Sequence, residues 1–182
     1  MEIPEISAVE LFDPASEGYA ASLARVRMAA EDVGFMTLTD TSLAAADVRR
    51  VLNTYRDFFT LSPEEKAPYN MANTGSNRGW GAPGAEQVDP EANPDFKEVF
   101  DCGLELPADD PLAAHTYYAP NLWPTEPAGF RDTITDYYQR ATTLSIDLLS
   151  AIASSIGEPA DYFRDKFDKP MALLRGNYYP VR

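Results

Sequence analysis

The chain has 182 residues, of which 45% are apolar, and this is enough material for one domain with its own hydrophobic core. A formal net charge of -14 disfavours binding to the phosphate backbone of a nucleic acid. Cys102 is the only cysteine, which excludes an internal disulfide and a zinc site built from cysteines.

The sequence shows no sign of a membrane segment or a secretory signal. Its longest apolar stretch, from Leu144 to Ile156, is interrupted by Asp147 and is shorter than the roughly 20 residues that cross a bilayer. The acidic start, Met1 to Ile6, lacks the basic and apolar regions of a signal peptide. We therefore expect a cytoplasmic protein.

The first part of the chain predicts two helices alternating with short strands. Apolar residues alternate from Ile3 to Phe12, which predicts a strand that ends at the turn Asp13-Pro14. A helix follows, closed by Gly34, and residues 35–39 have the composition of a strand. Residues 40–42 are N-cap candidates for the next helix. The expected buried positions are Leu23, Val26, Ala30 and Val33 in the first helix, and Val48, Leu52, Tyr55 and Phe59 in the second.

The middle of the chain predicts a short helix, a long surface excursion and a strand. Ser62 to Glu65 provide a cap, a proline at the first helical position and a capping-box glutamate. Residues 70–94 are rich in Gly, Pro and Asn, so we expect a surface segment with only brief strands. Residues 95–103 have the pattern of a strand.

The last third predicts the longest helix and a final strand. An apolar stripe runs through residues 126–156, and Gly157 and Pro159 end the helix. A shorter helix over 161–167 and a strand over 173–179 follow. The stripe consists of Phe130, Ile134, Tyr137, Ala141, Leu144, Leu148 and Ile152. The fold class is therefore α+β, with helices packed on one side of a small sheet.

Seven segments of the chain resemble the motifs of a known protein family, both in their residues and in their order along the chain. They are Ile3-Pro4-Glu5-Ile6, Glu31 to Met36, Phe58 to Lys66, Arg78-Gly79-Trp80, Asp95 to Phe100, Asn121 to Pro124, and Asn177-Tyr178-Tyr179-Pro180. In this order they resemble the isopenicillin N synthase-like family of non-haem iron(II), 2-oxoglutarate-dependent dioxygenases. One departure is Asp40-Thr41-Ser42, where the family commonly has N-H-G, and we interpret it as a change of helix cap.

The resemblance implies the N-terminal part of a double-stranded β-helix (jelly-roll) enzyme that oxidises a small organic substrate with O2. Residues 1–124 would form the N-terminal region, and residues 125–182 would lead into the iron-binding β-helix. The family's H-x-D pair, later histidine and R-x-S motif follow N-Y-Y-P, whereas this sequence ends at Arg182. We therefore expect no catalytic residue and no metal ligand here, His115 being structural or exposed, and no activity from this chain alone.

The resemblance also implies cofactors and site residues. The family uses Fe(II) and 2-oxoglutarate, and Asn177 and Tyr179 would hydrogen-bond 2-oxoglutarate. The alternative is an ordinary strand with packed tyrosines. Arg78, on a Gly-rich loop, can bind an anionic group of the primary substrate, or it can pair structurally with one of the 29 acidic residues. Cys102 should be a buried, inert thiol, and Glu98 part of the framework.

Three interpretations of the sequence remain open. The chain is a piece of an oxidoreductase, a stand-alone binding or regulatory module without catalysis, or one half of a split dioxygenase. Oxidation without 2-oxoglutarate, as in isopenicillin N synthase itself, also stays open. The strand over 173–179 would lack a partner strand on at least one edge, so we expect a homodimer or pairing with the missing C-terminal half.

Overall fold

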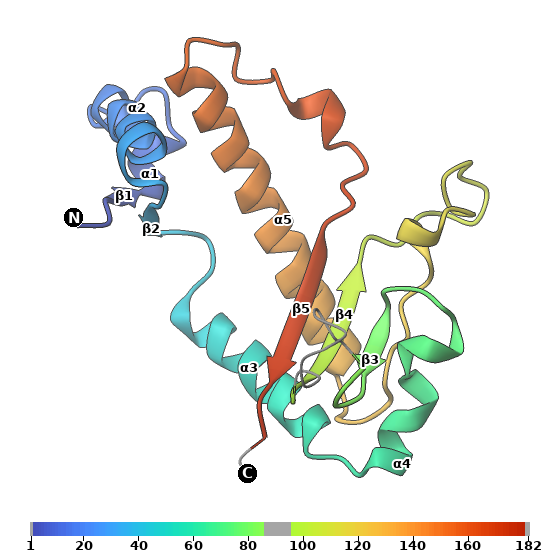
Figure 1. The fold of residues 1–182 in the computed structure, drawn as a ribbon. Helices are drawn as coiled ribbons and strands as arrows, with labels where there is room; N and C mark the ends of the chain where they lie inside the picture. Colours follow the sequence, from blue (N-terminus) through green and yellow to red (C-terminus); the bar gives the residue numbers. More distant parts are fainter. Residues whose placement is uncertain (1, 86–95, 181–182) are drawn as a thin grey trace, which may run out of the picture. The chain divides into compact units, whose positions relative to one another are not determined.

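The computed structural model describes residues 2–85 and 96–180, and these form two compact units (Figure 1). One unit comprises Met1–Ala44 and Gln139–Pro170, and the other comprises Ala45–Tyr138 and Met171–Arg182. Both contain helices and small sheets, which confirms the α+β class. Among the described residues, no helix is both long and apolar enough to cross a membrane. The predicted division at residue 124 rests on sequence resemblance and stays a prediction.

The first unit is mostly helical. Its elements are β1 (Glu5–Ser7), α1 (Ala8–Leu11), α2 (Tyr19–Met28), the π-helical turn η1 (Ala29–Val33), β2 (Thr37–Thr39), the second part of α5 (Phe130–Ser155), and the 3-10 turn η5 (Arg164–Lys166). Strands β1 and β2 pair in parallel, with Ile6 opposite Leu38. The buried core consists of Ile6, Leu11, Val26 and Ala151, with Leu148 and Ile152 of α5 packed against it.

The predicted strand over residues 3–12 is wrong beyond Ser7, where the chain turns into α1. Ala8 and Leu11 are buried while Val9 is 66% exposed. A spacing of three residues is one turn of a helix, so burial here follows the helical period and not the alternation of the sequence. The predicted helix over 161–167 is also wrong, because only the turn η5 forms there.

Within the first unit, the segment around β2 differs in detail from the prediction. Gly34 closes the second helix with a φ of +82°, as predicted, but Ala29 is the buried alanine and Ala30 is exposed. Asp40 has a φ of +53°, and its carboxylate accepts hydrogen bonds from the hydroxyls of Ser7 and Thr39. Asp40 therefore ends β2 and does not act as the predicted helix cap.

The second unit has a three-stranded antiparallel sheet, in the order β3-β4-β5. Its elements are α3 (Ala45–Phe59), α4 (Pro63–Lys66), η2 (Ala67–Tyr69), η3 (Met71–Asn73), β3 (Gly79–Gly81), β4 (Glu98–Gly103), η4 (Thr116–Tyr118), the first part of α5, and β5 (Leu173–Tyr178). The predicted strand over 95–103 is confirmed from Glu98 onward, while Asp95 lies outside the described residues.

An aromatic core joins α3, α5 and the sheet. The ring centroids of Phe58 and Phe100 lie 5.0 Å apart, as do those of Phe100 and Phe130. The buried face of α3 consists of Val51, Tyr55, Phe58 and Phe59. The prediction of Leu52 as a core residue is wrong, because this aromatic face turns Leu52 outward and leaves it 61% exposed.

A buried ion pair joins α4 to β4. The capping box of Ser62 and Glu65 forms as predicted and begins the helix that carries Lys66. Lys66 Nζ donates to Glu98 Oε2 at 2.7 Å and to the Phe59 carbonyl at 2.9 Å, and Trp80 Nε1 donates to the same carboxylate oxygen at 2.7 Å. The side chains of the pair are 4% and 10% exposed, so neither charge is solvated by bulk water.

The end of β4 is held by the side chain of Asn121. Its amide oxygen accepts from the Gly103 N–H at 2.9 Å, and its amide nitrogen donates to the Gly103 carbonyl at 2.8 Å. The side chain thus satisfies backbone groups that would otherwise be buried without a partner. Pro124, a little further along the chain, is buried before α5 begins.

Removing one charge of the Lys66–Glu98 pair should destabilise the chain strongly. We expect Lys66→Met to cost about 3–5 kcal/mol, because Glu98 would remain charged and buried without its cation. Urea unfolding measures this loss. The double variant Lys66→Met, Glu98→Gln should recover part of it. The exposed pair Arg27–Glu31 is the control, and Arg27→Met should cost less than about 1 kcal/mol. Equal losses of stability in Lys66→Met and Arg27→Met would contradict the assignment of Lys66 and Glu98 as a buried pair on which the fold depends.

Cys102 should resist thiol reagents in the folded chain. It is buried, as predicted, and burial raises the pKa of its thiol to about 12. The reactive form is the thiolate, so at pH 8 the folded chain should react at least about tenfold more slowly than the chain in denaturant. Labelling with a chromogenic disulfide measures both rates. Similar rates in the two states would show that the thiol is accessible.

Candidate functional site

Strand β5 presents two different rows of side chains. Exposure alternates along it, so that Leu174, Gly176 and Tyr178 are half-buried, while Leu173, Arg175 and Asn177 are exposed. The buried row packs on α3, where Tyr178 stacks on Phe59 at 5.3 Å between ring centroids. A Cβ on Gly176 would lie 2.7 Å from the Tyr55 ring, so only glycine allows this close approach.

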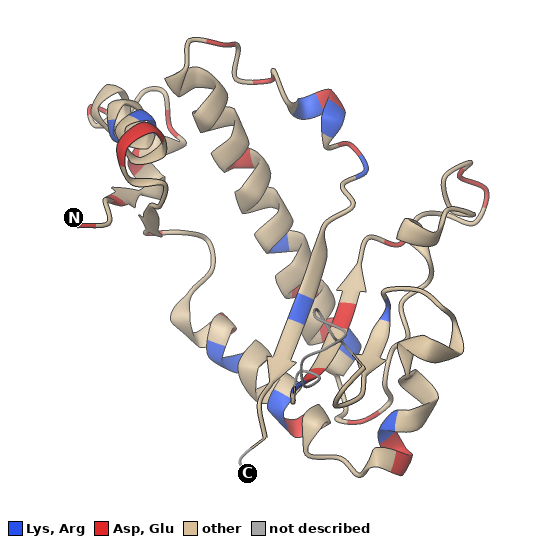
Figure 2. Cartoon of the chain, viewed as in Figure 1, with Lys and Arg blue, Asp and Glu red and all other residues tan. Residues whose placement is uncertain are grey.

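An ion pair on the exposed row connects β5 to β4. Asp101 and Arg175 lie opposite each other in the sheet register. Arg175 Nε donates to Asp101 Oδ1 at 2.8 Å, and Nη2 donates to Oδ2 at 2.7 Å. Figure 2 shows a basic position on β5 and an acidic position on β4. The carboxylate is fully buried while the guanidinium side chain is 35% exposed. This bidentate geometry fixes the orientation of Arg175 two residues before Asn177.

Arg175 and Asp101 are not among the residues that the sequence singles out. The sequence does contain a signal that points to Arg175, because residues two apart on a strand lie on the same face. Arg175 therefore shares the face of Asn177, and an acidic residue on the neighbouring strand is the natural partner for it. The pairing itself depends on the register of β4 against β5, which the sequence does not show.

Asn177 and Tyr179 lie on the exposed side at the end of β5. Asn177 is exposed and lies opposite Val99, and Tyr179 is 69% exposed just after the strand. The tyrosine that packs in the core is Tyr178. An amide and a phenol next to each other on one face offer neutral hydrogen-bond donors to a ligand. Their role toward 2-oxoglutarate stays a prediction.

Arg78 is buried at the other end of the strand. It is 3% exposed and donates to the backbone carbonyls of Tyr117 at 2.6 Å, Ala119 at 3.3 Å and its neighbour Asn77 at 3.3 Å. Burial lowers the pKa of its guanidinium. Arg78 also lines a hollow of about 80 Å³ that includes Leu173.

The structure thus brings Asn177 and Tyr179 together but does not place Arg78 beside them. Leu173 and Tyr179 are six positions apart, which is roughly 20 Å in an extended strand. Arg78 lies near the first of these residues. Its hydrogen bonds are to backbone carbonyls, so a structural role is evident, while a role toward the substrate stays a prediction.

The described residues do not fit an iron(II) site. Such a site needs two histidines and a carboxylate on one face. His115 is exposed, as predicted, and its ring stacks on Tyr117 at 5.2 Å. Across residues 2–85 and 96–180, no three His, Cys, Asp or Glu side chains are grouped so that they can hold a metal ion.

Comparison with known proteins shows similarity to non-haem dioxygenases and related hydroxylases. A family model described as the N-terminal region of the non-haem dioxygenase in morphine synthesis matches residues 3–126. The chain is 36% identical over 140 residues to the 2-oxoglutarate-dependent dioxygenase frbJ of Dothideomycetidae sp., covering 75% of this chain and 37% of that protein. It is 30% identical over 188 residues to the proline hydroxylase buaE of Petromyces alliaceus, covering 100% of this chain and 56% of that protein.

The fold is also that of solved dioxygenase structures. The crystal structure of a full-length Neurospora crassa protein in complex with alpha-KG matches with a TM-score of 0.78 and 29% identity. The match covers 98% of this chain and 55% of that structure, so the chain spans about half the length of its relatives. By sequence and by fold, the chain belongs to the non-haem dioxygenase N-terminal family and corresponds to the N-terminal part of 2-oxoglutarate/Fe(II) dioxygenases.

Proposed function

We propose that the chain is the N-terminal portion of an Fe(II)/2-oxoglutarate-dependent oxidoreductase that oxidises a small organic substrate with O2. The observation that carries this proposal is the pair of exposed donors Asn177 and Tyr179, at the end of a strand in a chain of this family. Two relatives support the choice of co-substrate: frbJ is named for 2-oxoglutarate, and the Neurospora crassa protein was solved in complex with alpha-KG, which is the same compound.

In this proposal, Asn177 and Tyr179 bind and orient 2-oxoglutarate. The Asn177 amide N–H and the Tyr179 hydroxyl donate to oxygens of the dicarboxylate. Arg175 lies beside them, but its charge is balanced by Asp101 in a bidentate pair. When bound in the whole protein, iron(II) and 2-oxoglutarate supply the oxidising chemistry. The described residues contribute binding and orientation, and no iron-dependent step is assigned to them.

We further propose that Arg78 acts on the primary-substrate side. It lines the hollow near Leu173, toward the opposite end of β5 from Tyr179, so a substrate that contacts Arg78 must extend roughly 20 Å along the strand to reach the end where 2-oxoglutarate binds. The backbone carbonyls that Arg78 contacts hold its guanidinium in place. A guanidinium held in this way can present its remaining N–H groups to an anionic group of the substrate.

In the whole protein, Asn177→Ala and Tyr179→Phe should weaken the use of 2-oxoglutarate more than the use of the primary substrate. Each change removes a hydrogen bond to a charged ligand, worth about 1.5–3 kcal/mol, or roughly tenfold to a hundredfold in affinity. The measurement is the apparent KM for both substrates. Asn53→Ala and Tyr162→Phe are matched controls on exposed positions elsewhere and should change neither KM. An unchanged KM for 2-oxoglutarate in both site variants would show that Asn177 and Tyr179 do not bind 2-oxoglutarate and have a structural role.

The 182-residue chain alone should not bind iron(II) at a stoichiometric level, and it should not couple 2-oxoglutarate decarboxylation to oxidation. The physical reason is the lack, among its described residues, of the two histidines and carboxylate that the metal needs. Anaerobic titration of the purified chain with iron(II) measures the binding. One tightly bound iron per chain that is lost in His115→Ala would overturn this expectation.

A further inference from the structure

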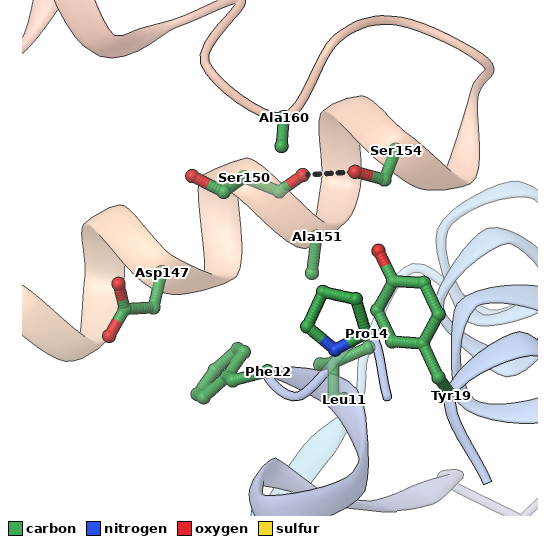
Figure 3. Close-up of a pocket in the computed structure, with 9 residues that line it drawn as sticks. All are labelled: Leu11, Phe12, Pro14, Tyr19, Asp147, Ser150, Ala151, Ser154 and Ala160. Atoms are coloured by element: carbon green, nitrogen blue, oxygen red, sulfur yellow. Dashed lines mark hydrogen bonds between the residues drawn. The ribbon is translucent and has the colours of Figure 1, made fainter. Parts of the chain in front are cut away.

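A second hollow lies entirely within the first unit, separate from β5. Its volume is about 200 Å³, and it lies between residues 11–19 and the second part of α5 (Figure 3). Leu11 and Ala151 are buried side chains that line it. Phe12 and Tyr19 add two half-buried aromatic rings. The wall that these residues form is therefore largely apolar and aromatic.

The polar groups of the hollow lie on α5 and at the end of Tyr19. Asp147 and Ser150 are one helical turn apart and both line the hollow. In Figure 3 the Asp147 side chain lies on the Phe12 side, and the Tyr19 hydroxyl points toward the helix turn that carries Ser154. The Ser154 hydroxyl donates to the Ser150 carbonyl at 3.0 Å, so it is satisfied within the helix. Asp147 is exposed and brings the negative charge.

The charge of the hollow comes from a single side chain. Of the described residues that line it, only Asp147 is charged. The nearest basic residues in the sequence, Arg25, Arg140 and Arg164, do not line the hollow. A carboxylate at the wall attracts cations and repels anions. The charge complements a cation, and the aromatic walls favour one that has an apolar body.

We propose that this hollow binds a small organic cation, namely a primary ammonium group on an aromatic body. The ammonium group would lie at Asp147, and the body would pack against the rings of Phe12 and Tyr19. Aromatic faces attract cations, and this attraction adds to that of the carboxylate. A cavity of about 150 Å³ holds benzene, so a hollow of this size accepts a ring with a short amine chain. This assignment does not rest on the proposed oxidoreductase function.

Phenethylamine is a suitable probe for the 182-residue chain. Titration followed by amide NMR shifts should give saturable changes at residues 11–19 and 147–160. Asp147→Asn should weaken binding about fivefold, as expected for an ion pair open to solvent, and added salt should weaken it in the same direction. Tyr19→Leu should weaken binding further, because it removes one aromatic wall.

Two matched controls make the test decisive. Asp57→Asn removes the same charge from an exposed position on α3 and should leave the affinity unchanged. The neutral analogue 2-phenylethanol has the same body without the charge and should bind at least about fivefold more weakly. Equal affinity for amine and alcohol, an unchanged affinity in Asp147→Asn, or shifts confined to other residues would overturn the proposal. Asp147 is exposed, so its amide variant should fold and keep the test valid.

Discussion

The structure of the second unit depends on the buried pair of Lys66 and Glu98. Taking two charges out of water costs several kcal/mol per ion, and only close pairing with further hydrogen bonds offsets this cost. Trp80 and the Phe59 carbonyl complete those bonds. Because any displacement of β4 would leave Glu98 buried without its cation, the pair fixes α4, β3 and β4 relative to one another.

A second ion pair acts on the opposite face of the same strand. Glu98 faces the aromatic core, and Asp101, three positions on, faces Arg175 of β5. A shift of one residue would exchange the two faces of β4 and break both pairs. The register of β5 follows from this, and the register decides that Gly176 and Tyr178 pack inward while Asn177 stays exposed.

The many acidic residues of this chain serve in different ways according to their surroundings. In the second unit, Glu98 and Asp101 are buried, and each is matched by a cation at hydrogen-bonding distance. In the first unit, Asp147 lines a hollow, and no basic residue is among the described residues that line it. Acidic residues therefore stabilise one unit and give a negative charge to the wall of a cavity in the other. Net charge alone does not distinguish these uses.

The sequence by itself determined the class of fold, the capping box at Ser62, the closing Gly34 and the family, because each depends on local chemistry or on ordered motifs. Only the tertiary structure decided the α1 helix after Ser7, the outward position of Leu52 and the pairing of Asp101 with Arg175. Apolar spacing fixes which residues can share a face, but packing against distant segments selects the face that is buried and the charges that meet.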